Sequence, residues 1–273
     1  YKRQLESIVE RPAEKRQLYA RLEPLLPEDV ILASNTSTIS IGRLAAELSD
    51  PGRFCGLHFF HPVARRALVE VVRGPQTSDE TVATLVNHAR RIGKIPIVVS
   101  DGPGFLVNRL LLPYLNEALE LLLDGASIEQ IDRTATEFGM ATGPIGLMDE
   151  IGLDTVLMGG MVLHEAFPDR IPASPLLIGL VKAGRLGRKS GAGFLSYFEA
   201  NGTDRPSQPD PVFERILARW ARPRQHFTPT QLLGRLLLPM VLEATRILEE
   251  GKVRDARAID LGVLFGLGFP RFR

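Results

Sequence analysis

Two ionisable side chains, His58 and Glu70, have a spacing that could support acid–base chemistry. In the stretch GLHFFHPVARRALVEVVRG, His58 lies near the end of one apolar run and Glu70 near the start of the next. Both are equally far from Ala64, so they oppose each other if Pro62 ends the first strand and residues 64–66 form the connection. Opposed residues of an antiparallel pair hold their Cβ atoms about 5 Å apart, within reach of a carboxylate–imidazole bond. Such a bond fixes the tautomer and leaves the other ring nitrogen free to accept a proton, which predicts a general base.

The competing interpretation of this pair is a satisfied, half-buried histidine beside a solvated strand glutamate. Further motifs favour the catalytic interpretation, because NTST lies upstream at residues 35–38 and DGPGFLVNRLLLPYLNEA begins at Asp101. Together these motifs resemble the 3-hydroxyacyl-CoA dehydrogenases, from about Glu10 to Tyr197. The resemblance implies an NAD cofactor and the oxidation of L-3-hydroxyacyl-CoA to 3-oxoacyl-CoA in fatty-acid β-oxidation.

The resemblance also implies roles for individual residues. His58 matches the base that takes the hydroxyl proton while hydride passes from C3 to the nicotinamide ring, and Glu70 matches the glutamate that orients it. Ser37 and Asn108 match the hydroxyl and the amide that hold the substrate oxygen, and Ser37 is also placed at the cofactor. Without the resemblance, the residues alone favour a turn or cap role for Ser37, and for Asn108 a helix residue that bonds the backbone.

Three more residues match positions near the cofactor. Glu10 is expected at the end of the strand LESIV, and Lys15 on the helix that follows. The alternative for these two is an ordinary solvated charge pair. His61 departs from the family pattern, since asparagine is usual there; an imidazole could still donate a hydrogen bond, but its charge would vary with pH.

Composition excludes several classes of function. The 273 residues are 44% hydrophobic and 24% charged, which is typical of a globular protein with room for two domains. A formal net charge of +1 gives no electrostatic footprint for nucleic acid, and no run is long and apolar enough for a membrane span or a signal peptide. The single cysteine, Cys55, is expected to be a small buried hydrophobe in a reducing compartment, and the five histidines form no metal-ligand cluster. We therefore expect a cytoplasmic protein that binds no metal.

Residues 1–100 alternate helical and extended patterns, which predicts an α/β unit. Helices are expected at residues 13–26, 41–48 and 78–92, with Ser78 as N-cap, and strands at residues 30–33, 54–60, 68–72 and 95–99. The pattern is typical of only the second half of a doubly wound, Rossmann-like domain, because no strand, glycine-rich turn and helix precede Glu10. The chain is therefore expected to be a fragment or a truncated gene product.

Beyond residues 102–104 the apolar period becomes helical. Helices are expected at residues 105–123, from the cap at Ser127 to Phe138, at 153–167 and at 174–183, with a linker at 198–211 and further helices after it. The motif RLLLP at Arg109 recurs at Arg235, a shift of 126 positions, and neighbouring motifs recur nearly in the same register. Because Gly234 replaces Asn108 in the second copy, we expect the first copy to be functional and the second to serve packing.

These patterns predict three regions, at residues 1–100, 101–200 and 212–273. The resemblance implies that the first is a partial NAD-binding domain without the glycine-rich turn, the second a first helical dehydrogenase C-terminal domain, and the third a second, incomplete helical repeat. The tandem copies resemble the multifunctional α-subunit of bacterial fatty-acid oxidation complexes, which implies an acyl-CoA thioester substrate and, as candidate partners, a thiolase subunit and a second copy of the chain. Two other functions stay open: an inert scaffold or interaction fragment of such a protein, and a related dehydrogenase for a different β-hydroxy acid.

Overall fold

The computed structural model describes residues 3–200, 203–206 and 211–272, and the chain divides by packing into two compact units. The first unit consists of residues 1–109 and 244–267, and the second of residues 110–243 and 268–273. The end of the second sequence copy therefore packs with the sheet region, although more than a hundred residues separate the two in the chain.

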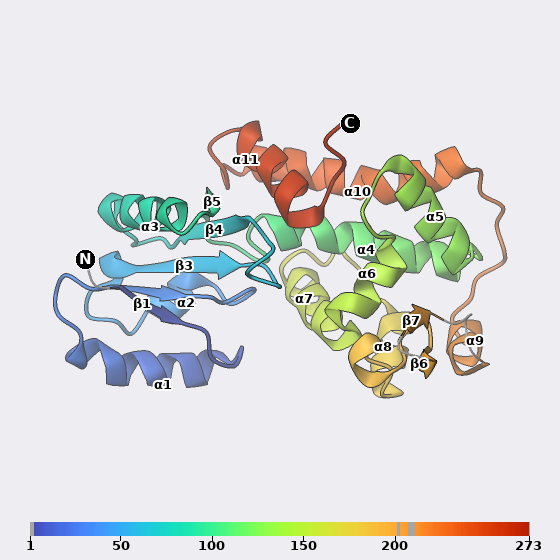
Figure 1. Cartoon of the computed structure of the whole chain (residues 1–273), viewed down its shortest axis with the longest axis horizontal. Helices are drawn as coiled ribbons and strands as arrows, with labels where there is room; N and C mark the ends of the chain where they lie inside the picture. The colour runs from blue at the N-terminus through green and yellow to red at the C-terminus, as the bar shows by residue number, and fades with distance from the viewer. Residues whose placement is uncertain (1–2, 201–202, 207–210, 273) are drawn as a thin grey trace. The chain divides into compact units, whose positions relative to one another are not determined.

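The first unit is built on a five-stranded sheet whose strands follow one another in sequence order (Figure 1). The first three strands are parallel, the fourth is antiparallel to the third, and the fifth is parallel to the fourth. The strands are β1 (Arg3–Glu6), β2 (Ile31–Ser34), β3 (Phe54–Phe59), β4 (Leu68–Arg73) and β5 (Ile95–Ser100). The expected strands at 30–33, 54–60, 68–72 and 95–99 are confirmed to within one residue at each end.

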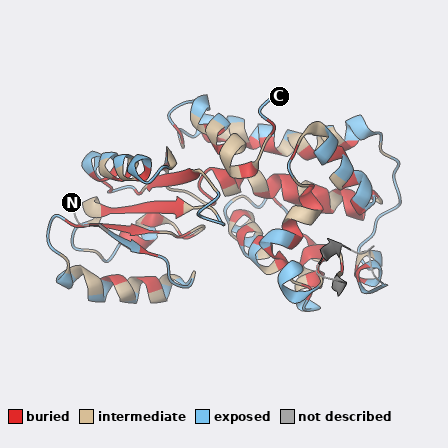
Figure 2. Cartoon of the chain, in the orientation of Figure 1, coloured by how far each residue is buried: buried red, intermediate tan, exposed pale blue. Residues whose placement is uncertain are grey.

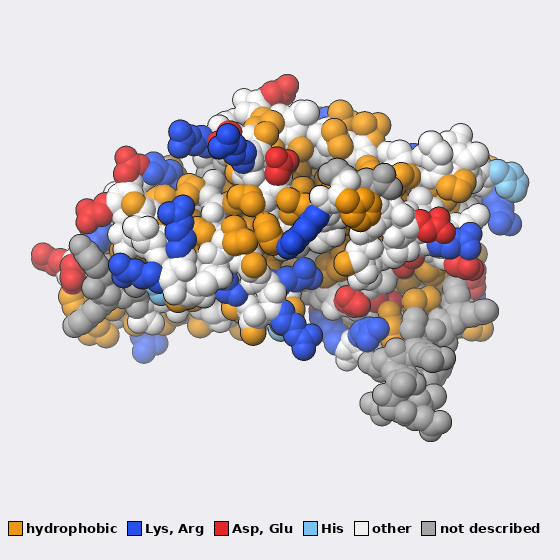
Figure 3. Space-filling model, turned by 45° about the horizontal axis from the view of Figure 1, so that its top comes forward, with side chains coloured by type: hydrophobic (Ala, Val, Ile, Leu, Met, Phe, Trp, Pro, Cys, Tyr) orange, Lys and Arg blue, Asp and Glu red, His pale blue; other side chains and the backbone are white. Residues whose placement is uncertain are grey.

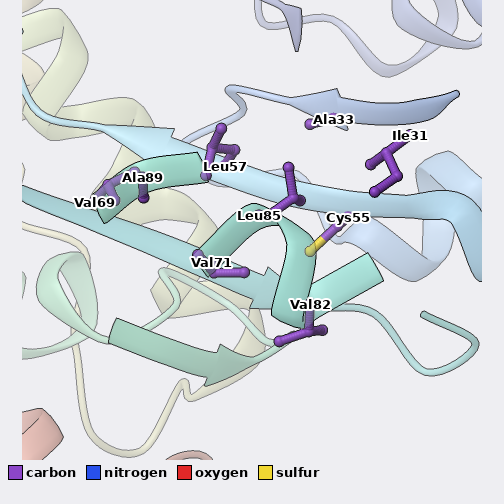
Figure 4. Packing of buried hydrophobic residues seen from close by; sticks show 9 residues of the cluster. All are labelled: Ile31, Ala33, Cys55, Leu57, Val69, Val71, Val82, Leu85 and Ala89. Carbon is purple, nitrogen blue, oxygen red and sulfur yellow. The ribbon is translucent and has the colours of Figure 1, made fainter. Parts of the chain in front are cut away.

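Helices cover both faces of this sheet (Figure 1). They are α1 (Pro12–Leu22), α2 (Ile41–Ala45) and α3 (Asp79–Arg91), so the predicted helices are confirmed, α2 being shorter than expected. Helix α3 begins where predicted, because the Ser78 side chain accepts a hydrogen bond from the Thr81 N–H. Its buried face packs on β2, β3 and β4 in one apolar cluster: Ile31, Ala33, Cys55, Leu57, Val69, Val71, Val82, Leu85 and Ala89 (Figure 4).

The cluster decides where the polar pair of the hairpin must point. Successive strand residues face opposite sides of a sheet, and Leu57 and Val69 face α3. His58 and Glu70 therefore face the other side. On that side Tyr19 of α1 packs edge-on against Phe54, with ring centroids 5.2 Å apart. Figure 2 shows that this sheet is buried along most of its strands, so the pair lies in the interior of the unit.

The second unit is mainly helical. Helix α4 (Val107–Leu123) begins in the first unit and continues into the second, followed by α5 (Ile128–Phe138), α6 (Pro144–Ile151), α7 (Leu153–Ala166), α8 (Pro175–Lys182), α9 (Pro211–Ala218) and α10 (Pro229–Glu249). Helix α11 (Ala256–Leu261) and a π-helical segment (Gly262–Leu267) then belong to the first unit. The predicted helices are confirmed. Ser127 forms the full capping box with Gln130 at the start of α5.

The predicted linker at 198–211 is wrong for the part that the structure describes. Two short antiparallel strands, β6 (Tyr197–Ala200) and β7 (Thr203–Pro206), pair there, and α9 already begins at Pro211. Residues 201–202 and 207–210 lie outside the described residues. Pro206 does not prevent this pairing, because a proline at the end of a strand in a two-stranded ribbon removes no obligatory hydrogen bond.

The internal repeat is present in the structure. Pro113 and Pro239 occupy equivalent places inside α4 and α10, and both helices are followed by a glycine with positive φ, Gly125 (97°) and Gly251 (62°). Glycine is required at such a left-handed position because it carries no Cβ. Repetition at the level of backbone conformation supports the sequence match.

The two copies also exchange equivalent ion pairs. In the first unit, Arg109 at the start of α4 makes a two-pronged bond to Glu250, just after α10, at 2.7 and 2.8 Å. In the second unit, Arg235 near the start of α10 bonds Asp124, just after α4, at 2.7 Å. Because Arg109 corresponds to Arg235 and Asp124 to Glu250, the contacts are reciprocal, as in an interface between two like subunits.

Two expectations from composition can be compared with the structure directly. Cys55 is a free, fully buried thiol, as predicted, and burial raises its pKa to about 12. None of the described helices combines the length and the hydropathy needed to cross a membrane.

Candidate active site

The centre of the site is the predicted pair. His58 in β3 lies directly opposite Glu70 in β4, and its Nδ1 is 2.6 Å from Glu70 Oε2. The exposed fractions of the two side chains are 5% and 0%. A carboxylate can only accept a hydrogen bond, so Nδ1 carries the proton and Nε2 presents its lone pair.

The second oxygen of Glu70 binds the beginning of α4. Glu70 Oε1 accepts hydrogen bonds from Leu106 N at 3.0 Å and Val107 N at 2.9 Å. These N–H groups belong to the unpaired donors that every helix start presents, and they suit a negative charge. Both oxygens of this buried carboxylate therefore accept hydrogen bonds, and the bonds to the start of α4 hold it in its orientation toward His58.

The backbone just before α4 has the conformation that makes those donors available. Gly104 and Phe105 both have positive φ, 70° and 50°, so the chain turns sharply and α4 begins at Val107, two residues later than predicted. The Phe105 ring meets the His58 ring edge-on, with centroids 5.9 Å apart, and the Phe60 ring centroid lies 4.6 Å from that of His58. The imidazole is thus held by aromatic rings, and its Nε2 has no hydrogen bond to any described residue.

The two predicted substrate-binding residues come together in the same unit. The Asn108 Nδ2 group donates to the Ser37 carbonyl oxygen at 3.3 Å. Both residues are half-buried, and Asn108 directly follows the helix start that binds Glu70. The turn after β2 and the first residues of α4 are therefore joined beside the His58–Glu70 pair.

The Glu10 carboxylate orders the turn that carries Ser37. Its Oε1 accepts from Thr36 Oγ1 at 2.6 Å, from Ser37 N at 2.8 Å and from Thr38 N at 3.1 Å. Glu10 is four residues beyond the end of β1 rather than at the end of the strand as expected. The Glu10 side chain is therefore held by its hydrogen bonds to residues 36–38 and not by the pairing of β1.

Lys15 is buried rather than solvated, so the alternative of an ordinary solvated charge pair does not describe it. Its Nζ lies 2.7 Å from Glu6 Oε1 and 3.4 Å from Glu10 Oε2, and its side chain is 1% exposed. Glu6, which the sequence interpretation overlooked, also accepts from Tyr19, from Ser34 Oγ at 2.7 Å and from Ile8 N at 2.6 Å.

The bonds around Glu6 explain how a charge is kept inside the unit. Burial acts to raise the pKa of Glu6, but the bonds from Lys15, Ser34 and Tyr19 outweigh it and hold the pKa below the usual value. The only signal in the sequence was an acidic residue inside a short strand with a lysine nine positions on, which is too common to identify a buried pair.

His61 lies apart from this network. It is exposed and follows the end of β3, whereas the other predicted site residues are buried or half-buried. Among the residues that the structure describes, no group of three His, Cys, Asp or Glu side chains could hold a metal ion. On the face shown in Figure 3, charged side chains of both signs are scattered between hydrophobic ones, in keeping with the small net charge.

Known proteins share this arrangement of domains. Residues 4–102 match the 3-hydroxyacyl-CoA dehydrogenase NAD-binding domain, and residues 104–197 match the C-terminal domain of the same family. The chain belongs to the 3-hydroxyacyl-CoA dehydrogenase family. It is an NAD-dependent oxidoreductase of that family, which confirms the predicted class of enzyme and the predicted cofactor.

Solved structures of dehydrogenases are similar to this family member over most of its length. The (S)-3-hydroxybutyryl-CoA dehydrogenase PaaH1 from Ralstonia eutropha is 43% identical, with a TM-score of 0.70 over 72% of this chain and 71% of that one. The 3-hydroxybutyryl-CoA dehydrogenase from Escherichia coli K12 is 27% identical, with a TM-score of 0.83 over 98% and 72%. The dehydrogenase part of multifunctional enzyme 1 from C. elegans is 30% identical, with a TM-score of 0.65 over 98% and 60%. The two matches over 98% of this dehydrogenase must include its second helical copy.

The ends of β1 and β2 in this dehydrogenase offer surfaces that suit NAD. The turn at Ser37 is ordered by Glu10, whose carboxylate is an acceptor of the kind that ribose hydroxyls bind. Ile8 and Val9, just after β1, are 42% and 56% exposed, which leaves apolar surface beside that turn for a ring to cover. The residues present are therefore of the types that an NAD site needs: a hydrogen-bond acceptor and exposed apolar surface.

Proposed function

We propose that this chain catalyses the NAD-dependent oxidation of L-3-hydroxyacyl-CoA to 3-oxoacyl-CoA, with His58 as general base oriented by Glu70. The observation that carries the proposal is the 2.6 Å contact between two buried side chains, with His58 Nε2 left unbonded among the described residues. His58 Nε2 is not one of the fully enclosed polar atoms that lack a partner, so a substrate hydroxyl could reach it although the ring is mostly buried. The fatty-acid β-oxidation setting follows from the substrate class.

The proposed step separates a proton from a hydride. His58 Nε2 takes the proton of the C3 hydroxyl, the O–H electron pair forms the carbonyl bond, and the C3 hydrogen leaves with its electrons. When bound, NAD supplies the acceptor for that hydride. Glu70 stabilises the imidazolium that forms, and in the reverse direction the same imidazolium returns the proton to the alkoxide oxygen.

Ser37 and Asn108 are proposed to position the reacting oxygen. The Asn108 amide already bonds the Ser37 backbone at 3.3 Å, a long contact that a substrate oxygen could replace or extend. Glu10 is proposed to hold the side of the same turn that faces the cofactor. Lys15, whose ammonium group is buried, is proposed to act on the cofactor only through its contact with the Glu10 carboxylate. His61, being exposed, is proposed to meet the cofactor from the end of β3.

The test is the reduction of acetoacetyl-CoA, followed by the loss of NADH absorbance. His58→Ala is expected to lower kcat by about 10²–10⁴, the usual contribution of a general acid–base group. Glu70→Gln is expected to lower kcat by about a hundredfold or more, because the amide NH₂ would require an acceptor at Nδ1 and so place the proton on Nε2. His226→Ala, at an exposed position, is the matched control. Unchanged turnover in His58→Ala would defeat the proposal.

Cofactor binding distinguishes this function from an inert scaffold. Calorimetric titration of the chain with NADH is expected to give heat that disappears in the Glu10→Ala variant. Binding that does not depend on Glu10 would move the cofactor site elsewhere. A panel of other β-hydroxy acids and their CoA esters, assayed with NAD, separates the proposed substrate from that of a related dehydrogenase.

The finer parts of the assignment are also proposals. We propose an origin in a multifunctional β-oxidation protein, the interpretation of residues 1–100 as the second half of the NAD-binding domain, and the functional limits at 101–200 and 212–273. The tandem helical copies are the support for the first of these; the match over 98% of the chain does not decide it, because the Escherichia coli 3-hydroxybutyryl-CoA dehydrogenase matches over the same share. A cytoplasmic location, a thiolase partner and self-association are proposed from the same resemblance. Co-purification of the tagged chain with a thiolase would test the partner.

A further inference from the structure

Asn35 connects three strand ends beside the proposed base. It follows β2 directly, and its own N–H donates to the Glu6 carbonyl at the end of β1, 2.8 Å away. Its Nδ2 donates to Ser7 Oγ at 3.1 Å, and its Oδ1 accepts from Phe59 N at 2.8 Å. One amide side chain thus joins the ends of β1, β2 and β3.

The bond to Phe59 replaces a missing part of the sheet. Pairing between β2 and β3 ends at Ser34 opposite Gly56, but β3 continues as far as Phe59. The Phe59 N–H therefore has no strand partner on the β2 side, and the Asn35 carbonyl oxygen takes the place of a backbone carbonyl. The orientation of the amide follows, because only its oxygen can accept from a backbone N–H.

Phe59 is the next residue after His58, so this bond bears on the base itself. On its other edge, β3 is fixed by β4, where His58 opposes Glu70. On the β2 edge beyond Gly56, the Asn35 side chain supplies the bond at the end of the strand. We infer that Asn35 is a positioning residue for His58, a role that rests on the proposed function for its catalytic meaning but not for its structural test.

The decisive variants separate the acceptor from the rest of the side chain. Asn35→Ala removes both bonds, whereas Asn35→Asp keeps an oxygen acceptor for the Phe59 N–H and loses the donor to Ser7. In Asn35→Ala, amide hydrogen exchange at Phe59 is expected to accelerate by about tenfold, and the downfield Nδ1–H proton signal of His58 to broaden. In Asn35→Asp, both observations are expected to return close to those of the parent chain.

The kinetic consequence is a change in kcat rather than in KM. Asn35→Ala is expected to lower kcat by about tenfold with little change in KM, and Asn35→Asp to recover most of that loss. Asn87→Ala, at an exposed position in α3, is the matched control for removal of an asparagine side chain. A general loss of stability would affect amide exchange throughout the unit and would not be rescued by aspartate.

Two outcomes overturn the inference. One is unchanged Phe59 exchange and an unchanged His58 signal in Asn35→Ala; the other is equal damage in the alanine and aspartate variants. Both are measured without substrate or cofactor. Activity that survives His58→Ala would instead defeat the proposed function, while the exchange experiment would still decide whether Asn35 fixes the end of β3.

Discussion

The starts of the two repeated helices, α4 and α10, differ at the place where chemistry is proposed. Helix α10 begins at Pro229, and the N–H of Leu232 donates to the Thr228 carbonyl, 3.0 Å away, as part of the helix's own hydrogen bonding. The equivalent N–H group in copy one, that of Leu106, instead binds Glu70. A glycine- and proline-containing turn precedes α4, which therefore begins later than α10 and leaves N–H donors free for Glu70, the carboxylate proposed to orient His58.

Equivalent positions on the two helices also differ in burial. Leu112 and Leu115 of α4 are 8% and 1% exposed, whereas the equivalent Leu238 and Val241 of α10 are each 56% exposed. The second copy packs through the buried side of α10 and also through its end, where Gly266 approaches Val107 so closely that a Cβ would lie 2.8 Å from its side chain. The same sequence pattern thus gives a mostly buried helix in one copy and a more exposed one in the other, in keeping with the proposal that the first copy carries the site.

The largest expected difference between the copies concerns their arginines. The Arg109 side chain is 1% exposed and doubly bonded to Glu250, so Arg109→Ala is expected to cost about 3–5 kcal/mol of unfolding free energy. The Arg235 side chain is 33% exposed, and Arg235→Ala is expected to cost only about 1 kcal/mol. Urea denaturation of the two variants measures both. Equal costs would show that burial does not distinguish these reciprocal pairs.

The next expected effect concerns activity. Asn108→Ala is expected to lower kcat/KM by about a hundredfold, because an oriented amide at the substrate oxygen would be lost. Its counterpart Gly234 is exposed with open space around it, so Gly234→Asn, which restores the residue of copy one, is expected to leave kcat/KM unchanged. Steady-state kinetics with acetoacetyl-CoA decide. Similar losses in both variants would contradict the division of roles between the copies.

A smaller effect is expected at the glycines that end the two helices. A Cβ at Gly125 would lie 2.7 Å from Arg224 Cγ and 3.1 Å from its Cα, whereas a Cβ at Gly251 meets nothing within 4 Å. Gly125→Ala therefore combines a left-handed backbone with a steric clash, at a cost of about 2 kcal/mol, and Gly251→Ala carries only the backbone cost of about 1 kcal/mol. Thermal melting of the two variants measures both costs. An equal or smaller loss of stability in Gly125→Ala would mean that Arg224 moves aside without cost.

The smallest expected effect is a pH dependence that belongs to copy one. Asp132 of α5 accepts bonds from Ile145 N and Gly146 N at the start of α6, and burial raises its pKa to about 6. A raised pKa means that the folded chain holds this proton more tightly than the unfolded chain. Stability from this group is therefore greatest in acid and falls as the pH rises from about 4 to about 6. Asp132→Asn is expected to flatten this fall, as measured by urea denaturation at several pH values.

Local sequence signals predicted most of the elements and the central pair. The apolar runs around His58 and Glu70, with Pro62 between them, were enough to place the two residues opposite each other, because a hairpin fixes its register locally. Caps at Ser78 and Ser127 gave the helix starts for the same reason. The strands at residues 197–206 were missed because their prolines and glycine have the composition of a linker.

Contacts over long sequence separations were beyond such signals. Glu6 is an ordinary acidic residue until the fold brings Lys15, Tyr19 and Ser34 around it. From its residue type, Asn35 is an ordinary turn residue, and only the fold brings the unpaired N–H at the end of β3 to its side chain. Neither residue type nor spacing predicts these partners, because they become neighbours through the order of the strands in the sheet and not through their positions in the sequence.

The sequence alone determined the periodicity of the strands and helices, the His58–Glu70 hairpin and the duplication, because all of these depend on neighbours in the chain or on repeated letters. Only the tertiary structure decided that Lys15 is buried, that Glu70 binds the start of α4, and that Arg109 bonds a residue 141 positions away. The physical reason is that burial and hydrogen bonding depend on which surfaces meet, and that choice is made by the packing of the whole unit.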